Sequence, residues 1–200
     1  KDWVHPQSKY PISSKIQYLR IKNNEYLIAV DTMGNPYIYN RKGQVRIKIP
    51  EGLIVQKNAV FYSDVQSKPP RILCLGQGGN IEAFDIKGKH SKLKPDSIHP
   101  EARLIVVREK EGKQLQYLIS SKNILTLYSK KGELIWSKTF SGAITETHIV
   151  SGAGQQALIA VHLADLDEIT MLDLKGSAKN GFPIIGQGFS KISTIKGQNS

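Results

Sequence analysis

The residues best able to do chemistry in this sequence are five histidines and one short acidic segment. The histidines are His5, His90, His99, His148 and His162, and no two of them have the spacing of paired metal ligands. His148 and His162 are expected to end two neighbouring strands and could therefore approach in space. With Asp165 and Asp167, from the segment HLADLDE (162–168), they form one candidate loop site. The acidic segment lacks the turn glycine of a calcium-binding loop, so we favour structural histidines beside a solvated loop and expect no metal.

A glycine-rich segment, VSGAGQQA (150–157), has the spacing of a dinucleotide-binding loop at Gly152, Gly154 and Ala157. Such a loop needs a helix that begins in its second half, so that backbone N–H groups face the pyrophosphate. Here QQALIAV continues as an apolar run typical of a strand. We therefore expect a plain turn between strands and no bound cofactor.

Several classes of protein are disfavoured. The sequence has no Gly-x-Ser-x-Gly elbow and no phosphate-binding loop. A single cysteine, Cys74 in the run ILCL, excludes an internal disulfide and a four-thiolate metal site. No apolar run reaches the roughly 20 residues of a membrane-spanning helix, and KDWVHPQSKY at the start is no signal peptide. We assign no catalytic residue, although a triad assembled in space would escape sequence analysis.

A repeat organises the chain around four glycines. Gly43, Gly88, Gly132 and Gly176 are spaced 45, 44 and 44 residues apart, and each follows a lysine: Lys42, Lys87, Lys131 and Lys175. Three residues before each glycine stands a short polar residue, which can hydrogen-bond its own backbone at a turn: Asn40, Asp85, Ser129 or Asp173. Four residues before it stands an aromatic or leucine: Tyr39, Phe84, Tyr128 or Leu172. The pattern predicts a tight hairpin in every repeat.

Each repeat is expected to hold four strands, called a to d in chain order, because two further runs precede every hairpin. The expected b strands are nearly continuous apolar runs at 26–30, 71–75, 116–120 and 157–161, typical of strands packed on both faces. The expected a strands lie at 15–21, 58–63, 102–107 and 144–150. We expect burial of five b-strand residues, namely Leu27, Ala29, Leu73, Leu118 and Ile159. No helical pattern is evident.

Four-stranded units of this length predict an all-β fold, a β-propeller of four-stranded antiparallel blades. We expect four full blades at about 14–50, 55–97, 101–141 and 143–186, and partial blades at 1–5 and 189–195. The partial blades favour a segment of a larger propeller over a small closed ring, and the missing initial Met agrees with a processed or excised piece. A β-sandwich requires no fixed period, and β-helix rungs are much shorter.

The hairpin with Trp136 four residues after Gly132 resembles the quinoprotein (pyrroloquinoline-quinone-type) propeller repeat, in which a tryptophan at this place docks neighbouring blades. Trp3 fits the same pattern, whereas the equivalent positions elsewhere are Ile47, Lys92 and Asn180. The segment DLKGSAKNGFPI (173–184) resembles repeats of uncharacterised bacterial propellers. Both resemblances imply the fold, and neither carries a catalytic or cofactor-binding residue onto this sequence.

The basic charge is concentrated in the hairpins. The windows 40–49, 85–94, 129–138 and 173–182 hold 13 of the 28 basic and 3 of the 17 acidic residues, a net +10, and leave +1 for the other 160 residues. One interpretation is that lysines on the outer d strands prevent pairing with other sheets. The other is that Lys42, Lys87, Lys131 and Lys175 form a face for an acidic polymer or partner, although the motifs of dedicated nucleic-acid modules are absent.

The leading functional hypothesis is a non-enzymatic interaction or scaffold propeller for a protein or glycan, because a well-formed repeat carries no chemistry on its loops. The alternatives are an enzyme or lectin of the quinoprotein-like or hydrolase-like propellers, and a polyanion-binding surface on the hairpins. We further expect self-association through open end blades. The single cysteine fits either redox compartment, and we slightly favour an extracytoplasmic location, periplasmic or at the cell surface.

Overall fold

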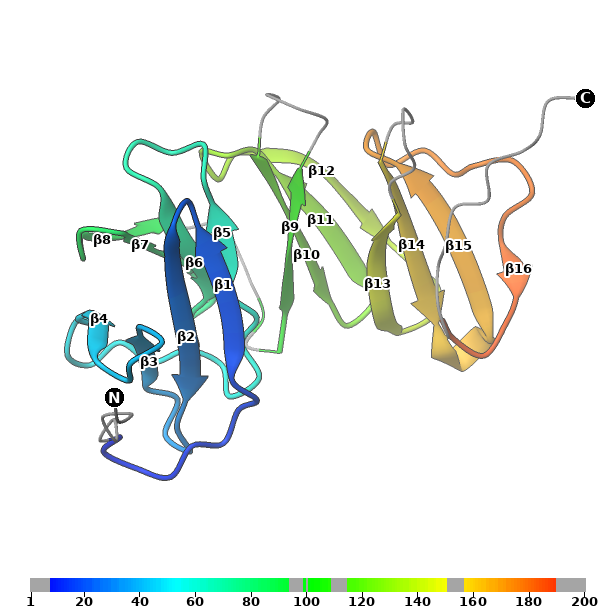
Figure 1. Cartoon of the computed structure of the whole chain (residues 1–200). Helices are drawn as coiled ribbons and strands as arrows, with labels where there is room; N and C mark the ends of the chain where they lie inside the picture. Colours follow the sequence, from blue (N-terminus) through cyan, green and yellow to red (C-terminus); the bar gives the residue numbers. More distant parts are fainter. Residues whose placement is uncertain (1–7, 94–98, 100, 109–114, 151–156, 190–200) are drawn as a thin grey trace, which may run out of the picture. The chain divides into compact units, whose positions relative to one another are not determined.

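The computed structural model describes residues 8–93, 99, 101–108, 115–150 and 157–189. The described part is almost entirely β-structure, arranged as antiparallel sheets of four strands each (Figure 1). Each sheet is made of four strands consecutive in the chain, and no described strand is exchanged between repeats. This topology matches the predicted blades and rules out the sandwich alternative.

The strands follow one another in the predicted order a to d. The first sheet holds β1 (Gln17–Ile21), β2 (Asn24–Val30), β3 (Pro36–Tyr39) and β4 (Val45–Ile47), and the second holds β5 (Tyr62–Asp64), β6 (Arg71–Leu75), β7 (Ile81–Asp85) and β8 (His90–Leu93). The third holds β9 (Arg103–Arg108), β10 (Leu115–Ser121), β11 (Ile124–Tyr128) and β12 (Leu134–Thr139), and the fourth holds β13 (Ile144–Val150), β14 (Leu158–Leu163), β15 (Glu168–Asp173) and β16 (Ile184–Ile185). The only helix in the described residues is the 3-10 turn η1 (Ala164–Leu166).

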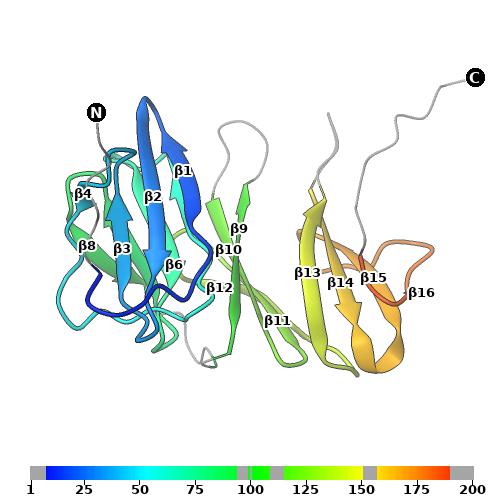
Figure 2. The same ribbon diagram turned by 60° about the horizontal axis from the view of Figure 1, so that its bottom comes forward.

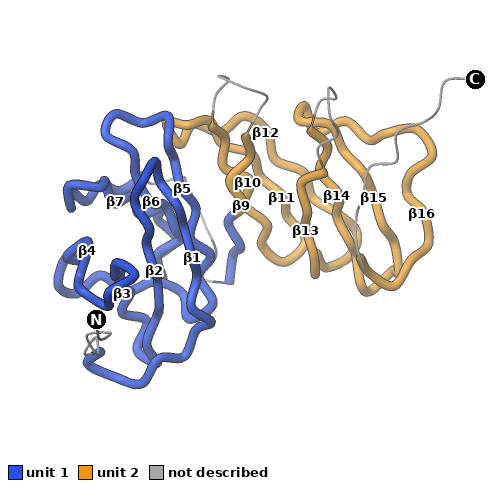
Figure 3. Tube along the Cα trace, viewed as in Figure 1, with its two compact units in different colours: residues 1–104 blue, residues 105–200 orange. Residues whose placement is uncertain are grey.

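The chain divides into two compact units, residues 1–104 and residues 105–200 (Figure 3). In the first unit, the first two sheets share one apolar core, in which Tyr26, Ile28 and Ile38 pack with Ile72 and Phe84. A bridge of hydrogen bonds supports this packing, because the Gln17 side chain donates to the Ala59 carbonyl at 2.7 Å and accepts from the Phe61 N–H at 2.9 Å.

In the second unit, the core lies between the third and fourth sheets. Leu118, Leu125 and Leu127 of the third sheet pack against Ile159 and Leu172 of the fourth. The strands β13, β14 and β15 lie side by side in Figure 2, with β14 at the centre and Ile159, Ala160 and Val161 fully buried. Burial on both faces explains why the b strands are nearly continuous apolar runs.

The predicted turn chemistry is present at all four hairpins. The side chain of Asn40, Asp85, Ser129 or Asp173 accepts hydrogen bonds from the backbone N–H groups two and four residues later, at 2.8–3.2 Å. The glycines that follow have φ between 78° and 90°, a conformation that L-residues with a side chain rarely adopt. The repeated sequence therefore encodes the repeated turn through local hydrogen bonds.

Two details of the prediction differ from the structure, and one lies outside the described residues. Leu27 is only half-buried, although Ala29, Leu73, Leu118 and Ile159 are buried as expected. Strand a of the second sheet covers only Tyr62–Asp64, later than the predicted run 58–63. The expected partial blades at 1–5 and 189–195 lie outside the described residues, apart from Phe189.

The fourth d strand also begins later than predicted. In the window 173–182 strand d is reduced to a single bridge, in which Ala178 lies opposite Leu172 and the Lys179 N–H donates to the Met171 carbonyl at 2.8 Å. A second turn follows, where the Phe182 N–H donates to the Lys179 carbonyl at 3.2 Å. Strand pairing resumes at β16, where Ile184 lies opposite Ile169. Of the basic residues of this repeat, Lys175 lies in the hairpin turn and Lys179 at the start of the second turn.

Candidate anion-binding site

The four turn lysines occupy the same place in each hairpin. Lys42, Lys87, Lys131 and Lys175 are all exposed, and each donates its backbone N–H to the turn side chain two residues before it. None of their ammonium groups has an ion-pair partner among the described residues. These lysines lie in the turns, whereas Arg46, Lys92 and Lys138 lie on the d strands themselves.

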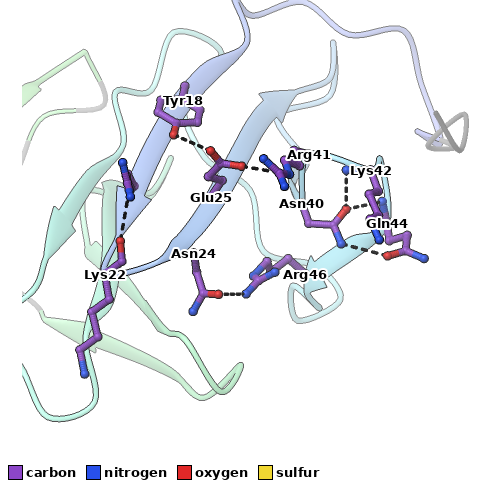
Figure 4. A network of polar contacts seen from close by, with 10 residues as sticks. Tyr18, Lys22, Asn24, Glu25, Asn40, Arg41, Lys42, Gln44 and Arg46 are labelled. Atoms are coloured by element: carbon purple, nitrogen blue, oxygen red, sulfur yellow. Dashed lines mark hydrogen bonds and ion pairs between the residues drawn. The ribbon is translucent and has the colours of Figure 1, made fainter. Parts of the chain in front are cut away.

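A polar hollow of about 400 Å³ lies beside the first of these hairpins. It is formed between the β1–β2 turn and the β3–β4 turn, which lie close together in Figure 4. Its lining consists of Arg20, Asn23, Asn24, Glu25, Asn40, Arg41, Lys42, Gln44 and Arg46. Four of these side chains are cationic and only one is acidic. We call this set of nine residues the basic hollow.

Two of its arginines are held in place by neighbouring side chains. The Arg46 guanidinium donates to the Asn24 side-chain oxygen and lies 5.3 Å from the ring centroid of Tyr26, a cation–π geometry. The Arg41 Nε lies 3.5 Å from a carboxylate oxygen of Glu25 (Figure 4). These contacts orient the guanidinium groups while their remaining N–H donors stay available, since each group carries five.

The carboxylate of Glu25 is shared. Besides Arg41, it accepts a hydrogen bond at 3.1 Å from the Tyr18 hydroxyl (Figure 4). Slight burial and then the Glu25 carboxylate raise the pKa of the Tyr18 hydroxyl, so Tyr18 stays protonated and donates at neutral pH. Glu25 therefore offsets only part of the charge of Arg41. The hollow keeps a net positive charge from Arg20, Lys42 and Arg46.

This arrangement can bind an anion. Planar guanidinium groups match carboxylate and phosphate oxygens in a bidentate manner, and the amides of Asn23, Asn40 and Gln44 add neutral donors and acceptors. Sequence analysis identified only Lys42 here. The run NRKGQVR (40–46) showed the density of cations, but the approach of the β1–β2 turn requires the fold.

The other candidate site, at the fourth sheet, is arranged differently from a metal centre. Asp165 and Asp167 are exposed, and the Asp165 carboxylate accepts a hydrogen bond from the Ala143 N–H at 3.1 Å. His148 lies opposite Ala160 and His162 opposite Glu146, so the two histidines share one face of the sheet in diagonal positions. Among the described residues, no group of three or more histidine, cysteine or acidic side chains could hold a metal ion.

His162 is a buried side chain with one satisfied nitrogen. Its Nδ1 lies 2.8 Å from the Thr145 hydroxyl, and its Nε2 has no hydrogen-bond partner among the described residues. The rings of His148 and His162 both meet the Phe189 ring edge to face, at centroid distances of 5.0 and 6.2 Å. The structure thus brings the two predicted histidines to one aromatic residue and leaves the two aspartates in the loop.

The glycine segment of the dinucleotide-like motif, at 151–156, lies outside the described residues. Its flanks are strands, since Val150 of β13 pairs antiparallel with Leu158 of β14. The motif therefore connects two antiparallel strands, and the chain enters β14, not a helix, immediately after Ala157.

Sequence analysis missed a buried polar cluster in the second sheet. Glu82 is 3% exposed, and its carboxylate lies 2.6 Å from His90 Nε2 and 3.8 Å from Lys92 Nζ. Burial, followed by the charge of Glu82, raises the pKa of the Cys74 thiol well above its usual value, so Cys74 is an unreactive core thiol. Glu82 and His90 stand on paired strands, with no spacing that a sequence pattern would reveal.

No model of a known protein family and no curated protein sequence matches the chain. Solved structures do. BBS1N, crystallised in complex with ARL6DN, is 17% identical with a TM-score of 0.60, over 90% of this chain and 57% of that one. The WD40 domain of SCAP from fission yeast is 13% identical with a TM-score of 0.56, over 90% of this chain and 45% of that one.

A protein of unknown function from Bacteroides caccae is 14% identical with a TM-score of 0.51, over 93% of this chain and 65% of that one. The chain thus spans less than two thirds of each of these proteins. Together with the four-stranded sheets, these similarities show that the chain is an all-β protein with the β-propeller fold. Within the described residues, no helix has the length and apolar character that a membrane crossing needs.

Proposed function

We propose that this chain is a non-enzymatic interaction module whose basic hollow binds acidic side chains of a protein partner. The observation that carries the proposal is the grouping of Arg20, Arg41, Lys42 and Arg46 around a single carboxylate in a hollow at one end of the first sheet. Closure of the first hairpin does not depend on these four cations, because its turn is closed by Asn40 and Gly43.

Two further observations support a protein partner. A propeller of similar fold, BBS1N, was crystallised in complex with another protein, ARL6DN. The chain also carries a net charge of +11, and a concentrated positive field accelerates association with acidic surfaces. Nucleic acid and acidic glycans are the competing partners. No aromatic side chain lines the hollow, so the stacking platforms typical of single-stranded nucleic-acid sites are missing there.

The test compares two variants with the same loss of charge. In the hollow variant, Arg41, Lys42 and Arg46 become Gln, and in the control variant Lys15, Lys68 and Lys179, exposed residues outside the hollow, become Gln. Binding to a glutamate-rich peptide, to heparin and to duplex DNA is measured by fluorescence anisotropy at low salt. We expect the hollow variant to lose about tenfold in affinity for the peptide, as three modest charge contacts imply.

Equal losses in the two variants would show that only total charge matters and would overturn the hollow as a site. A loss confined to heparin or DNA would replace the protein partner with that polymer. A third variant, with Lys42, Lys87, Lys131 and Lys175 changed to Gln, tests the whole set of turns. If its retention on heparin at low salt is unchanged, the turn lysines do not form a polyanion-binding face.

The finer resemblance to quinoprotein-type repeats is a separate proposal, supported by the packing of Trp136 against the next sheet. Its indole N–H donates to the Leu174 carbonyl at 2.9 Å, which is the docking role that the resemblance implies. We infer that this chain shares the tryptophan docking of quinoprotein-type repeats but does not share their enzymatic function. Titration with pyrroloquinoline quinone should therefore leave the melting temperature unchanged, and a saturable rise would favour the enzyme alternative.

A further inference from the structure

The amide side chains of the basic hollow have their oxygens already engaged. The Arg46 guanidinium can only donate, so the Asn24 atom that it contacts is the amide oxygen. The backbone N–H groups of Lys42 and Gln44 likewise meet the Asn40 oxygen. The Asn40 NH2 group is therefore the one that faces the Gln44 side chain, and it donates to the Gln44 oxygen at 3.0 Å.

The acidic side chain of the hollow is engaged in the same way. Glu25 accepts from the Tyr18 hydroxyl and pairs with Arg41. Of the side-chain acceptors that line the hollow, only the Asn23 amide lacks a partner within the described residues. What the lining offers a ligand is mainly the N–H groups of three arginines and one lysine. A ligand that must itself donate hydrogen bonds, such as a hydroxyl-rich sugar, finds almost no acceptor here.

The charge of the hollow exceeds what one carboxylate of a ligand would neutralise. Its lining holds four cations and one carboxylate, which leaves a net charge of +3. A glutamate or aspartate side chain of a partner brings one negative charge. A phosphate monoester brings about −1.5 to −2 at pH 7, together with three acceptor oxygens. The phosphate therefore matches both the excess of charge and the excess of donors better than a carboxylate does.

Arg46 is the donor best placed to hold a phosphate. Its guanidinium carbon lies 5.3 Å from the ring centroid of the buried Tyr26, and the group donates to Asn24 (Figure 4). Within the described residues only its Nη2 makes a hydrogen bond, so the other N–H donors remain for a ligand. A guanidinium binds two phosphate oxygens in parallel, and its fixed orientation reduces the entropy lost on binding.

We propose that the acidic side chain bound by the basic hollow is a phosphorylated one, such as phosphoserine, which the Arg46 guanidinium holds. This inference rests on the proposed function, since it names the chemical class of that ligand. A phosphorylated side chain is favoured over a lipid headgroup. All nine lining residues are polar, so none of them would enter the acyl region of a membrane.

Fluorescence anisotropy at low salt tests the inference with two peptides that differ at one position, which holds phosphoserine or glutamate. At pH 7.5 we expect the wild type to bind the phosphoserine peptide about tenfold more tightly, because the additional charge lies in a cationic site. At pH 5.5 the phosphate takes up a proton, since its second pKa is about 6, and the preference should fall to about threefold. No histidine is among the described residues that line the hollow, so binding of the glutamate peptide should change little.

A variant of unchanged charge tests the guanidinium. Arg46→Lys keeps the positive charge and removes the planar fork, so its affinity for the phosphoserine peptide should fall about fivefold. Arg103→Lys makes the same exchange at an exposed residue outside the hollow and should bind like the wild type. Circular dichroism checks that both variants are folded. Wild-type affinity in Arg46→Lys would overturn the bidentate contact on which the inference depends.

The remaining outcomes separate this inference from the proposed function. If the wild type binds both peptides equally and the hollow variant loses both, the inference is overturned and the proposed function stands. If the hollow variant retains both peptides, the two are overturned together. Vesicles that contain phosphatidic acid provide the last comparison. Tighter binding to them than to the phosphoserine peptide, with a loss in the hollow variant, would replace the phosphorylated side chain with a lipid headgroup.

Discussion

The indole of Trp136 in the third sheet lies directly over Gly176 in the last hairpin, so that a Cβ added at Gly176 would stand 3.1 Å from Trp136 Cδ2. The same indole donates its N–H to the Leu174 carbonyl. The last hairpin therefore also contacts the neighbouring sheet. Glycine is favoured at position 176 for two reasons: its backbone conformation and the close approach of the indole.

The first prediction separates these two reasons by comparing Gly176→Ala with Gly88→Ala. Gly176 and Gly88 have φ of +83° and +90°, so alanine costs about 1–2 kcal/mol of backbone strain at either place. A Cβ at Gly88 would meet no atom within 4 Å, whereas at Gly176 it meets the indole. We expect Gly176→Ala to lower the free energy of unfolding by about 1 kcal/mol more than Gly88→Ala.

Urea unfolding followed by circular dichroism measures this difference. As an internal check, the difference should shrink when Trp136→Phe is present in both backgrounds, because the smaller ring removes the close approach. Equal losses for the two alanine variants would mean that the indole yields without cost.

The second prediction concerns the buried carboxylate of Glu82. Gly76 leaves room for it, since a Cβ there would stand 2.8 Å from the Glu82 carboxylate oxygen. Glu82→Ala removes the partner of His90, whose Nε2 lies 2.6 Å away, and leaves a half-buried imidazole without its hydrogen bond. We expect a loss of about 2 kcal/mol in the free energy of unfolding.

Lys92→Gln is the matched control for Glu82→Ala. The Lys92 ammonium is 3.8 Å from the same carboxylate, but its side chain is 49% exposed, and such pairs contribute about 0–1 kcal/mol. In thermal unfolding, the melting temperature should therefore fall much less for Lys92→Gln than for Glu82→Ala. A Glu82→Ala protein as stable as Lys92→Gln would show that the buried pair contributes little.

The turns were predictable from the sequence because their cause is local. Asn40, Asp173 and their glycines close the hairpin through bonds within five residues. The order of the strands within each sheet could also be predicted, because it follows from the regular spacing of the turn glycines. The basic hollow was not predictable beyond Lys42, because Arg20 reaches it from another strand pair. The fourth d strand was misplaced because a second turn, closed by the Phe182 N–H on the Lys179 carbonyl, interrupts it after the single bridge at Ala178.

The third prediction uses the repeat to stabilise one turn. The Ser129 hydroxyl accepts its two turn hydrogen bonds at 3.2 Å, whereas the Asn40 side-chain oxygen accepts the equivalent bonds at 2.9 and 3.1 Å and its amide donates to Gln44 at 3.0 Å. The Ser129 hydroxyl already donates to the Glu133 carboxylate at 3.2 Å, and in Ser129→Asn the longer amide can make this bond and the two turn bonds at the shorter distances found for Asn40. We expect a gain of about 0.5 kcal/mol in the free energy of unfolding.

Chemical denaturation at neutral pH measures the gain, with Ser129→Ala as the control that removes both turn bonds and should lose about 1 kcal/mol. If Ser129→Asn is as unstable as Ser129→Ala, the turn in the third sheet does not tolerate the geometry found in the first.

The last prediction concerns acid stability and Asp31, which is fully buried after β2. Burial by itself raises the pKa of this carboxyl, but hydrogen bonds from the Asn35 side chain and N–H, the Tyr37 hydroxyl and the Met33 N–H outweigh it and lower the pKa below its ordinary value. The folded state therefore binds a proton at Asp31 less readily than the unfolded state, whose carboxyl has a pKa of about 4.

The stability that Asp31 contributes is consequently complete above about pH 4 and is lost as the pH falls through the lower folded-state pKa. Asp31→Asn removes this titration, so its free energy of unfolding should be lower than that of the wild type at pH 7 and the difference should narrow below about pH 4. Urea unfolding at pH 7, 5, 4 and 3 measures both. Glu51→Gln, at an exposed residue, is the control and should follow the wild type at every pH. A gap between Asp31→Asn and the wild type that stays constant down to pH 3 would mean that the carboxylate charge plays no part in holding this loop.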